Sequence, residues 1–352
     1  MKKLFFVLLA ATMTFTLVLD RSAAPAATKP IKLIYECWLP ASHAGHQEVT
    51  VPFFKGLEAA TNGLVTTEYN MAGVMGKPAE QYSRLVSGVT SVSQFGPSYT
   101  PGAFPMYSIS YNMISAPKLD YFARALIAMY KKGYFDKDFA DVKVIGLYGA
   151  GPFVLYSSNK EITSVKDMAG LKTRAANDAF VDVIKLLGAA PVTMPAGEVY
   201  LATQKGVVDA AWWVVDAIAT QKYYEVAKYC CNISMSIFSH VCAMNKNVWN
   251  SLPQSGKDYI NKNWEKYSTD WVAVTDNKLP AIFKLFQDTP GHKITQLSPA
   301  EMANLSKVLS PLWGKWIAET EAKKLPGKKA AQDLDKIFSD LGVKNALVGY
   351  TP

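Results

Sequence analysis

The sequence predicts an α/β protein of two domains, each with a mixed, mostly parallel sheet covered by helices. The first observation is that β-favouring segments alternate with segments of helical periodicity, which is typical of parallel sheets. The second is that this alternation runs twice, before and after a glycine-rich stretch at 149–152, where we expect the chain to cross between domains. The third is the length of 352 residues, which suits about two domains.

The first run of alternation ends near residue 148. Apolar and β-branched segments bounded by turn residues predict strands, and apolar residues three or four positions apart predict helices. Ligands of such sheets lie beyond the carboxyl ends of the strands, so the loop at 96–102 is a candidate cleft wall. The expected strands are 31–38, 64–69, 91–95 and 142–148, and the expected helices are 46–61, 77–86 and 121–132.

The second run begins at residue 153 and leads into a helical C-terminal part. We expect 239–245 to be a strand that returns to the first sheet, followed by a long helix that can brace both domains. Ser298, with Glu301 three residues later, predicts the capped start of a helix. The other expected strands are 153–158, 171–174, 190–194 and 207–213, and the expected helices are 178–187, 198–204, 254–278, 281–287 and 299–324.

Residues 1–26 have the pattern of a cleavable secretory signal peptide. Lys2 and Lys3 precede an apolar run at 4–19, and Ala-Pro-Ala at 24–26 fits the usual cleavage pattern. The run is shorter than the about 20 residues of a membrane span, although an uncleaved anchor would share its polarity. We therefore expect an exported, periplasmic protein whose mature chain starts near Ala27.

The charges are scattered along the chain. The formal net charge is +8, yet no long basic run occurs, so we expect no binding to nucleic acid. The four cysteines are Cys37, Cys230, Cys231 and Cys242, and their pairing cannot be deduced from sequence. A bond between Cys37 and Cys242 is conceivable, and burial of all four as small apolar residues is equally open. There is no C-x-x-C pair, and no carboxylate at useful spacing completes a metal set with His43 and His46, so we expect no metal.

Three blocks of the second run carry a specific pattern. They are Asp-Met-Ala-Gly-Leu-Lys-Thr-Arg at 167–174, Leu-Gly-Ala-Ala-Pro-Val-Thr-Met-Pro-Ala-Gly-Glu-Val-Tyr at 187–200, and Gln-Lys-Gly-Val-Val-Asp at 204–209. In this order and spacing, they closely resemble the solute-binding proteins of tripartite ATP-independent periplasmic (TRAP) transporters, the dicarboxylate-binding-protein (DctP) family. The N-terminal half agrees more loosely, and the resemblance covers most of the mature chain.

The resemblance implies a two-lobed periplasmic binding protein fold. In that fold the lobes exchange strands, a long helix spans both lobes, and an organic acid binds between them. Lobe I would comprise 27–150 with about 240–280, and lobe II would comprise 151–239 with about 281–352. The implied partners are a small organic acid and the membrane subunits of a TRAP transporter. We expect no cofactor, and the sequence leaves the oligomeric state open.

The resemblance also singles out Arg174, because the arginine of the Gly-Leu-Lys-x-Arg block grips the ligand carboxylate in this family. A guanidinium suits that role, since its planar fork can donate two parallel hydrogen bonds and stays charged. Without the motif, a structural ion pair would be the commoner role of an arginine.

The sequence departs from the family pattern in two places. It lacks the second arginine that many members carry in the strand at 153–158, and Trp212 replaces a carboxylate, which puts a bound metal in doubt. An aromatic wall with a single arginine favours a monocarboxylate with an apolar or aromatic body.

Further ligand-binding candidates come from the predicted strand ends. Trp212 and Trp213 are adjacent in a strand and point to opposite faces, so we favour Trp213 for contact and place Trp212 behind it. The alternatives are core packing for the tryptophans, turn chemistry for the loop residues and a structural role for a lone histidine. The other candidates are Trp38, Tyr99, Ser98, Phe153, His240 and Ala196. The resemblance adds Ala196, because relatives often carry a bulkier group at this position and the alanine would leave room for a larger ligand.

The common catalytic signatures are missing from the sequence. There is no Gly-x-Ser-x-Gly elbow, phosphate-binding loop or His-Glu-x-x-His block, and the histidines are dispersed. We therefore expect a non-enzymatic binding protein that captures a small organic carboxylate and delivers it to a secondary transporter. A ligand-sensing periplasmic module shares all of these features and stays open, and an exported hydrolase is the less favoured alternative.

Overall fold

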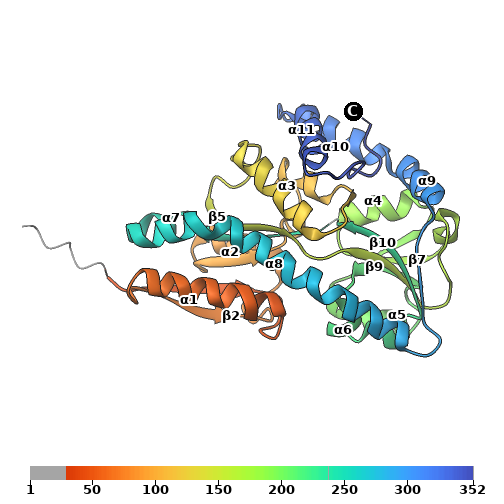
Figure 1. The fold of residues 1–352 in the computed structure, drawn as a ribbon, viewed down its shortest axis with the longest axis horizontal. Helices are drawn as coiled ribbons and strands as arrows, with labels where there is room; N and C mark the ends of the chain where they lie inside the picture. Colours follow the sequence, from red (N-terminus) through yellow and green to blue (C-terminus); the bar gives the residue numbers. More distant parts are fainter. Residues whose placement is uncertain (1–28, 237, 352) are drawn as a thin grey trace, which may run out of the picture.

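The structure, a computed structural model, describes residues 29–236 and 238–351. The signal peptide expected at 1–26 lies outside the described residues. The described chain forms two sheets, each flanked by helices, and we call the two units lobe I and lobe II (Figure 1). Across the described ranges, no helix combines the length and the apolar character that a membrane span requires.

Lobe I is built on a mixed sheet. Among the described residues its strands are β1 (Ile31–Cys37), β2 (Val65–Asn70), β3 (Val92–Phe95), β5 (Val142–Gly149) and β11 (Ser239–Asn245). Their order is β2, β1, β3, β11, β5, and only β11 runs against its neighbours within this described set. The helices that accompany the sheet are α1 (Val51–Ala60), α2 (Gln81–Ser87), α3 (Leu119–Lys131) and α7 (Lys246–Ser251).

Lobe II repeats this plan. Its described strands are β4 (Ile114–Ser115), β6 (Phe153–Ser157), β7 (Lys172–Ala175), β8 (Ala190–Thr193), β9 (Ala210–Val214), β10 (Tyr229–Ser236) and β12 (Lys293–Thr295). They follow the order β12, β10, β6, β9, β7, β8, with β4 paired to β10. The β6 strand is antiparallel to β9 and β10, whereas β7 is parallel to β8 and β9. Its short helices are α4 (Asp178–Leu186), α5 (Val199–Gln204) and α6 (Ala217–Thr220).

The lobes exchange strands where the chain crosses between them. The β6 strand follows β5 of lobe I and inserts between β10 and β9 of lobe II, and β11 follows β10 and inserts between β3 and β5 of lobe I. Gly151 at the first crossing has a φ of 146°, a backbone conformation that residues with a Cβ atom rarely adopt. The predicted crossing at 149–152 and the returning strand at 239–245 are both confirmed.

One long helix, α8 (Gln254–Asp288), spans both lobes (Figure 1). Its 35 residues extend about 52 Å at 1.5 Å per residue. Trp271 packs into the core of lobe I, and Phe286 packs into the core of lobe II. The helix break expected between 278 and 281 was wrong, because α8 continues through the exposed Pro280. The packing on either side of the proline supports the helix where one backbone hydrogen bond is lost.

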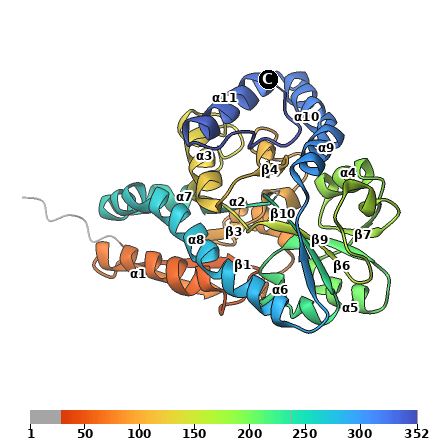
Figure 2. The ribbon, with the colours of Figure 1, turned by 45° about the vertical axis from the view of Figure 1, so that its right-hand side comes forward.

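The C-terminal helices divide between the two cores. The helix expected at 299–324 is in fact two helices, α9 (Pro299–Leu309) and α10 (Pro311–Ala322), because Pro311 starts a new helix directly after α9. Leucines of α9 join the core of lobe II, whereas tryptophans of α10 join the core of lobe I. The last helix, α11 (Gly327–Asp340), packs on α3 of lobe I (Figure 2). The sequence analysis had assigned all of 281–352 to lobe II.

All four cysteines are free and buried. In the sheet of lobe I, Cys37 pairs with Gln94, and Gln94 pairs with Cys242 on the other side. The two cysteines are therefore two strand spacings apart, or about 9.5 Å. This separation exceeds the about 7 Å between Cα atoms that a disulfide bond can bridge, so the conceivable bond between them is excluded in this fold.

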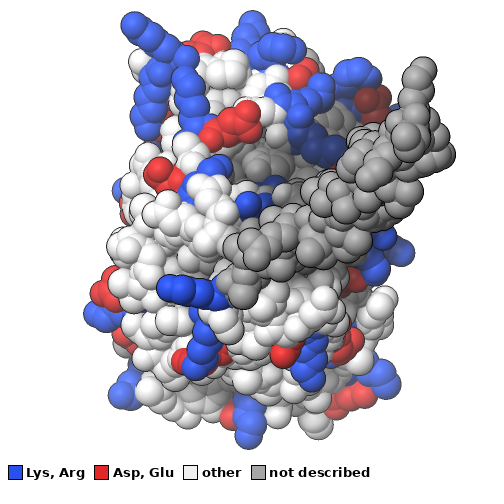
Figure 3. Space-filling view, turned by 90° about the vertical axis from the view of Figure 1, so that its left-hand side faces the viewer, with Lys and Arg blue, Asp and Glu red and all other residues white. Residues whose placement is uncertain are grey.

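The surface carries charges of both signs. Figure 3 shows basic and acidic side chains interspersed over the described part of one face. Many of them form exposed ion pairs one helical turn apart, such as Lys266 with Asp270 and Lys336 with Asp340. This pattern is typical of a solvated surface and matches the scattered charges of the sequence.

Candidate ligand-binding site

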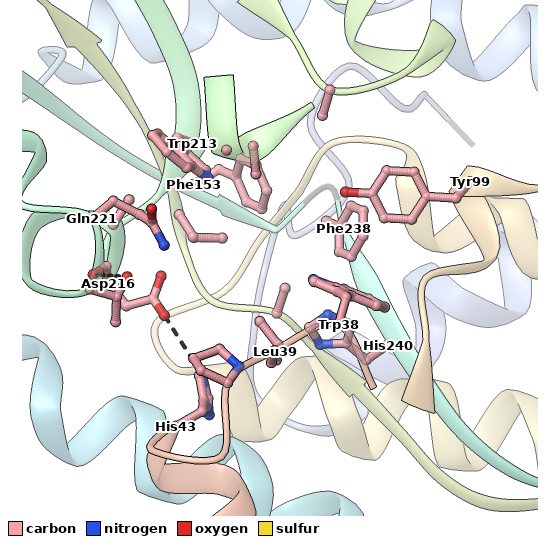
Figure 4. Close-up of a pocket in the computed structure, with 18 of the residues that line it drawn as sticks. Trp38, Leu39, His43, Tyr99, Phe153, Trp213, Asp216, Gln221, Phe238 and His240 are labelled. Atoms are coloured by element: carbon pink, nitrogen blue, oxygen red, sulfur yellow. Dashed lines mark hydrogen bonds and ion pairs between the residues drawn. The ribbon is translucent and has the colours of Figure 1, made fainter. Parts of the chain in front are cut away.

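A cavity of about 260 Å³ lies where the two lobes meet. Its wall includes the loop after β1 and the turn after β3 from lobe I, and the carboxyl ends of β7 and β9 from lobe II. This is the position at which α/β sheets bind their ligands. Figure 4 shows aromatic side chains from both lobes around it. The large apolar side chains of the wall are Trp38, Leu39, Tyr99, Phe153, Trp213 and Phe238.

Arg174 reaches this cavity from β7 and is only 2% exposed. Its Nε donates a hydrogen bond of 3.3 Å to the carbonyl of Met194, and its Nη1 donates one of 3.3 Å to the carbonyl of Trp212. Its guanidinium carbon lies 5.6 Å from the ring centroid of Trp213. These contacts from neighbouring strands hold the guanidinium in place at the cavity wall.

The charge of Arg174 is not neutralised by the described part of the chain. Burial lowers the pKa of Arg174 to about 10, which still leaves the guanidinium protonated at neutral pH. No described carboxylate lies within ion-pair distance of it, whereas many other basic side chains of the molecule are paired with carboxylates. Burial also raises the pKa of Tyr99, an effect that the nearby positive charge of Arg174 partly offsets. The site therefore holds a buried, fixed cation at the wall of the cavity.

Aromatic rings form the walls around that cation. The rings of Trp38 and Tyr99 pack edge to face with their centroids 5.7 Å apart, and the ring centroids of Phe238 and Tyr99 are 5.4 Å apart. From lobe II, Phe153 stacks at 6.5 Å from Phe238, which joins the two sides of the wall. Rings in edge-to-face contact are rigid apolar surfaces on which another ring can pack.

His240 lies on β11 against these rings. Its centroid is 4.9 Å from that of Trp38, and its side chain is 3% exposed. Burial, together with smaller effects of the nearby His43 and His46, lowers the pKa of His240 to about 3, so His240 is neutral. Its buried Nδ1 has no hydrogen-bond partner in the described structure. The described residues hold no group of three or more metal-binding side chains.

The cavity brings together seven of the nine expected residues. Ser98 instead lines a second cavity of about 200 Å³ on the other side of its turn, where its buried hydroxyl has no described partner. The side chain of Trp212 lies in the core of lobe II, because neighbours on β9 point to opposite faces. It contributes only its carbonyl to Arg174. The seven that line the cavity are Trp38, Tyr99, Phe153, Arg174, Ala196, Trp213 and His240.

The sequence analysis missed polar residues at the mouth of the cavity. His43 follows β1 in lobe I and Asp216 follows β9 in lobe II, and they approach to 3.7 Å between Nε2 and Oδ2 across the lobe boundary (Figure 4). Gln221 lies beside them on the lobe II side. They lie in loops and at a short helix end, so no periodic pattern marks them. Phe238 was also missed, because it follows the unassigned strand β10.

A larger cavity of about 500 Å³ adjoins the first one. His43, Asp216 and Gln221 line both cavities, so the mouth residues stand between them. The outer cavity is bounded on its far side by α8 residues such as Thr275 and Lys278. The cleft is thus a small inner chamber with a cation and an outer chamber against the long helix.

Comparison with known proteins identifies the family of the chain. The family model of the bacterial extracellular solute-binding proteins, family 7 (DctP), matches residues 36–320. The C4-dicarboxylate-binding periplasmic protein DctP of Rhodobacter capsulatus is 25% identical over 283 residues, which cover 78% of this chain and 83% of that protein. The resemblance stated from the sequence is therefore confirmed.

Solved structures share the two-lobed fold. A TRAP solute-binding protein from Rhodoferax ferrireducens, in complex with copurified benzoate, has a TM-score of 0.81 at 20% identity and covers 89% of this chain and 98% of its own. A marine metagenome TRAP solute-binding protein specific for aromatic acid ligands, in complex with 3-hydroxybenzoate, has a TM-score of 0.80 at 23% identity and covers 89% and 99%. Fold, motif and family match agree: the chain belongs to family 7 of the bacterial extracellular solute-binding proteins, the DctP family of TRAP solute-binding proteins.

Proposed function

We propose that this protein binds a monocarboxylate with an apolar or aromatic body in the inner chamber and delivers it to the membrane subunits of a TRAP transporter. The observation that carries the proposal is the buried guanidinium of Arg174, which faces a cavity and has no described carboxylate partner. A buried charge without a counter-ion is unfavourable, so an anionic ligand would remove an existing penalty.

The cavity wall supports a ligand with one carboxylate. Arg174 is the only lysine or arginine among the described residues that line the inner chamber, and Asp216 at its mouth would repel a second negative group. The chamber of about 260 Å³ exceeds the roughly 150 Å³ cavity that a benzene ring can occupy. An aromatic acid therefore fits both its volume and its apolar wall.

The relatives support the aromatic part of this assignment. Two proteins of the same fold were solved with benzoate and with 3-hydroxybenzoate. The Rhodobacter capsulatus relative is a C4-dicarboxylate-binding protein, but its ligand would carry a second carboxylate for which the chamber described here offers no second fixed cation.

The proposal also includes export to the periplasm, closure of the lobes around the ligand and recognition by a membrane partner. The signal-peptide pattern at 1–26 supports export to the periplasm, where family relatives act. The cavity has walls from both lobes, so the ligand can favour a state in which they close around it by hinge motion at the crossings. The membrane partner would then recognise the closed state.

The direct test is calorimetric titration of the purified protein with benzoate and with benzamide, its neutral analogue. Benzoate should bind and benzamide should not, because only the carboxylate can pair with the buried cation. The Arg174→Gln variant should lose roughly 30-fold or more in affinity for benzoate, the lower end of the cost of breaking a buried charge pair. The matched control is Arg124→Gln, which removes an exposed guanidinium paired with Asp120 on α3 and should bind benzoate normally.

Two outcomes would remove the proposal. If Arg174→Gln binds benzoate as tightly as the wild type, Arg174 is not the carboxylate site. If benzamide and benzoate bind equally well, the cavity recognises the ring alone. Circular dichroism of each variant shows whether a loss of binding reflects a loss of fold.

A further inference from the structure

Asp216 is a partly buried carboxylate without a hydrogen-bond donor in the described structure. Its side chain is 23% exposed and lines both the inner and the outer chamber. Its backbone carbonyl accepts hydrogen bonds from α6, including one from the hydroxyl of Thr220, but these do not reach the carboxylate. The ion-pair contact of Asp216 within the described residues is with His43, whose Nε2 lies 3.7 Å from Oδ2, too far for a direct hydrogen bond.

The orientation of His43 is fixed by the loop around it. Its ring stacks on Trp271 with centroids 4.9 Å apart, and its Nδ1 accepts a hydrogen bond of 3.1 Å from the amide of Gly45. In the neutral ring one nitrogen accepts and the other carries the proton, so this bond assigns the proton to Nε2. The protonated nitrogen, Nε2, is therefore the one that lies 3.7 Å from Oδ2 of Asp216 (Figure 4).

Nε2–H of His43 is a hydrogen-bond donor and Oδ2 of Asp216 is an acceptor, so a ligand group that contacts both must accept one hydrogen bond and donate another. An oxygen atom about 2.8 Å from both Nε2 and Oδ2 would lie within hydrogen-bond distance of both. A hydroxyl would donate to the carboxylate of Asp216 and accept from His43. An ammonium could satisfy only Asp216, because it has no lone pair to offer to Nε2–H.

Asp216 and Arg174 belong to separate parts of the cavity wall. They form no ion pair with each other, although both line the inner chamber. Both side chains line the same chamber of about 260 Å³, so a single small molecule in it can touch both.

We propose that the ligand carries a hydroxyl group on its body, away from the carboxylate, and that Asp216 and His43 bind this hydroxyl at the mouth of the inner chamber. This inference rests on the proposed binding of a carboxylate by Arg174 and names the class of acid more narrowly. The ligands of highest affinity are hydroxylated aromatic acids, and Asp216 is the residue that discriminates them from their parent acids.

The test compares each hydroxy acid with its parent and its methyl ether by calorimetry. The probes are 3-hydroxybenzoate and 4-hydroxybenzoate with benzoate, and 4-hydroxyphenylacetate with phenylacetate, together with the methoxy analogues. In the wild type, at least one hydroxy acid should bind roughly ten- to hundredfold more tightly than its parent, the range for a hydrogen bond to a charged group. The methoxy analogue, which cannot donate, should lack this gain.

Variants then assign the discrimination to its residue. In Asp216→Ala the preference for the hydroxy acid over its parent should fall to about one. This ratio is taken within the variant, so a general change in its affinity for aromatic acids cancels. The matched control is Asp178→Ala, which removes an exposed carboxylate from the second interlobe cavity and should keep the full preference.

The outcomes separate this inference from the proposed function. Equal affinity of the wild type for every hydroxy acid and its parent overturns the hydroxyl site alone, and so does a preference that survives in Asp216→Ala. Failure of the wild type to bind any acid of the series overturns the proposed function and this inference with it. The comparison among ligands on the wild type needs no variant, so it holds even if Asp216→Ala fails to fold.

Discussion

The guanidinium of Arg174 lies 5.6 Å from the ring centroid of Trp213, and both side chains are almost entirely buried. Both come from neighbouring parallel strands, β7 and β9, which pair directly. The aromatic face stabilises the cation where water cannot, and it keeps the guanidinium beside the cavity rather than in a surface ion pair. The buried charge and its aromatic support are thus part of one sheet.

Replacing Trp213 with leucine should weaken benzoate binding about tenfold. The change removes a cation–π contact and part of an aromatic wall, which together contribute on the order of 1–2 kcal/mol. Calorimetry gives the affinity. Trp249→Leu is a matched control, because Trp249 also contacts a cation, Lys143 at 4.8 Å, but does not line the chamber. Equal effects of the two substitutions would show that the loss is not local to the site.

The affinity for benzoate should be constant from about pH 6 to 9 and should fall above about pH 10. Burial lowers the pKa of Arg174 to about 10, and deprotonation above that value removes the charge that pairs with the carboxylate. Titrations at stepwise pH measure the effect, with circular dichroism to confirm that the protein stays folded. A decline that begins near neutral pH would assign the dependence to a histidine instead.

The protein should lose stability as the pH falls from about 6.5 toward 3. Burial lowers the pKa of His240 to about 3, whereas a histidine in the unfolded chain has a pKa near 6.5, so only the unfolded state gains a proton in this window. The expected loss from His240 between pH 7 and pH 5 is about 2 kcal/mol. Urea unfolding at both pH values should show a smaller loss for His240→Phe, and an identical loss in the variant and the wild type would contradict this assignment.

Replacing Pro280 with alanine should stabilise the protein by about 1–3 kcal/mol. Alanine restores a backbone N–H that can donate to the carbonyl one turn earlier in α8, and Pro280 is exposed, so no core contact is lost. Urea unfolding measures the change. A lower stability of the variant would mean that the backbone of α8 is adapted to the proline.

The strand pattern and the motif made much of the site predictable. Arg174 was assigned from the Gly-Leu-Lys-x-Arg block. Trp38 was assigned because it follows the carboxyl end of a predicted strand, the end at which such sheets bind their ligands. The same geometry distinguished Trp213 from Trp212, since the side-chain period of a strand is two. These inferences needed only local periodicity and one recognised sequence block.

The remaining parts depend on contacts that no local pattern records. His43 and Asp216 lie on different lobes and approach each other only after both have folded. The β10 strand (Tyr229–Ser236) includes asparagine and serine, which are rare in strands, so its sequence gave a weak signal. At Pro280 the sequence predicted a helix break that the structure does not have. Tertiary packing stabilises α8 through this residue, which usually ends a helix.

The strand exchange has a consequence for the order of folding. The β11 strand lies between β3 and β5, so the sheet of lobe I stays split until residues 239–245 have been synthesised. Trp313 and Leu334 complete the same core still later. Contacts so distant along the chain form slowly, because a long loop must close before they are made. Lobe I can therefore complete its fold only after the C-terminal part of the chain is present. Removal of α11 would destabilise lobe I, although the first strand of this lobe begins at Ile31.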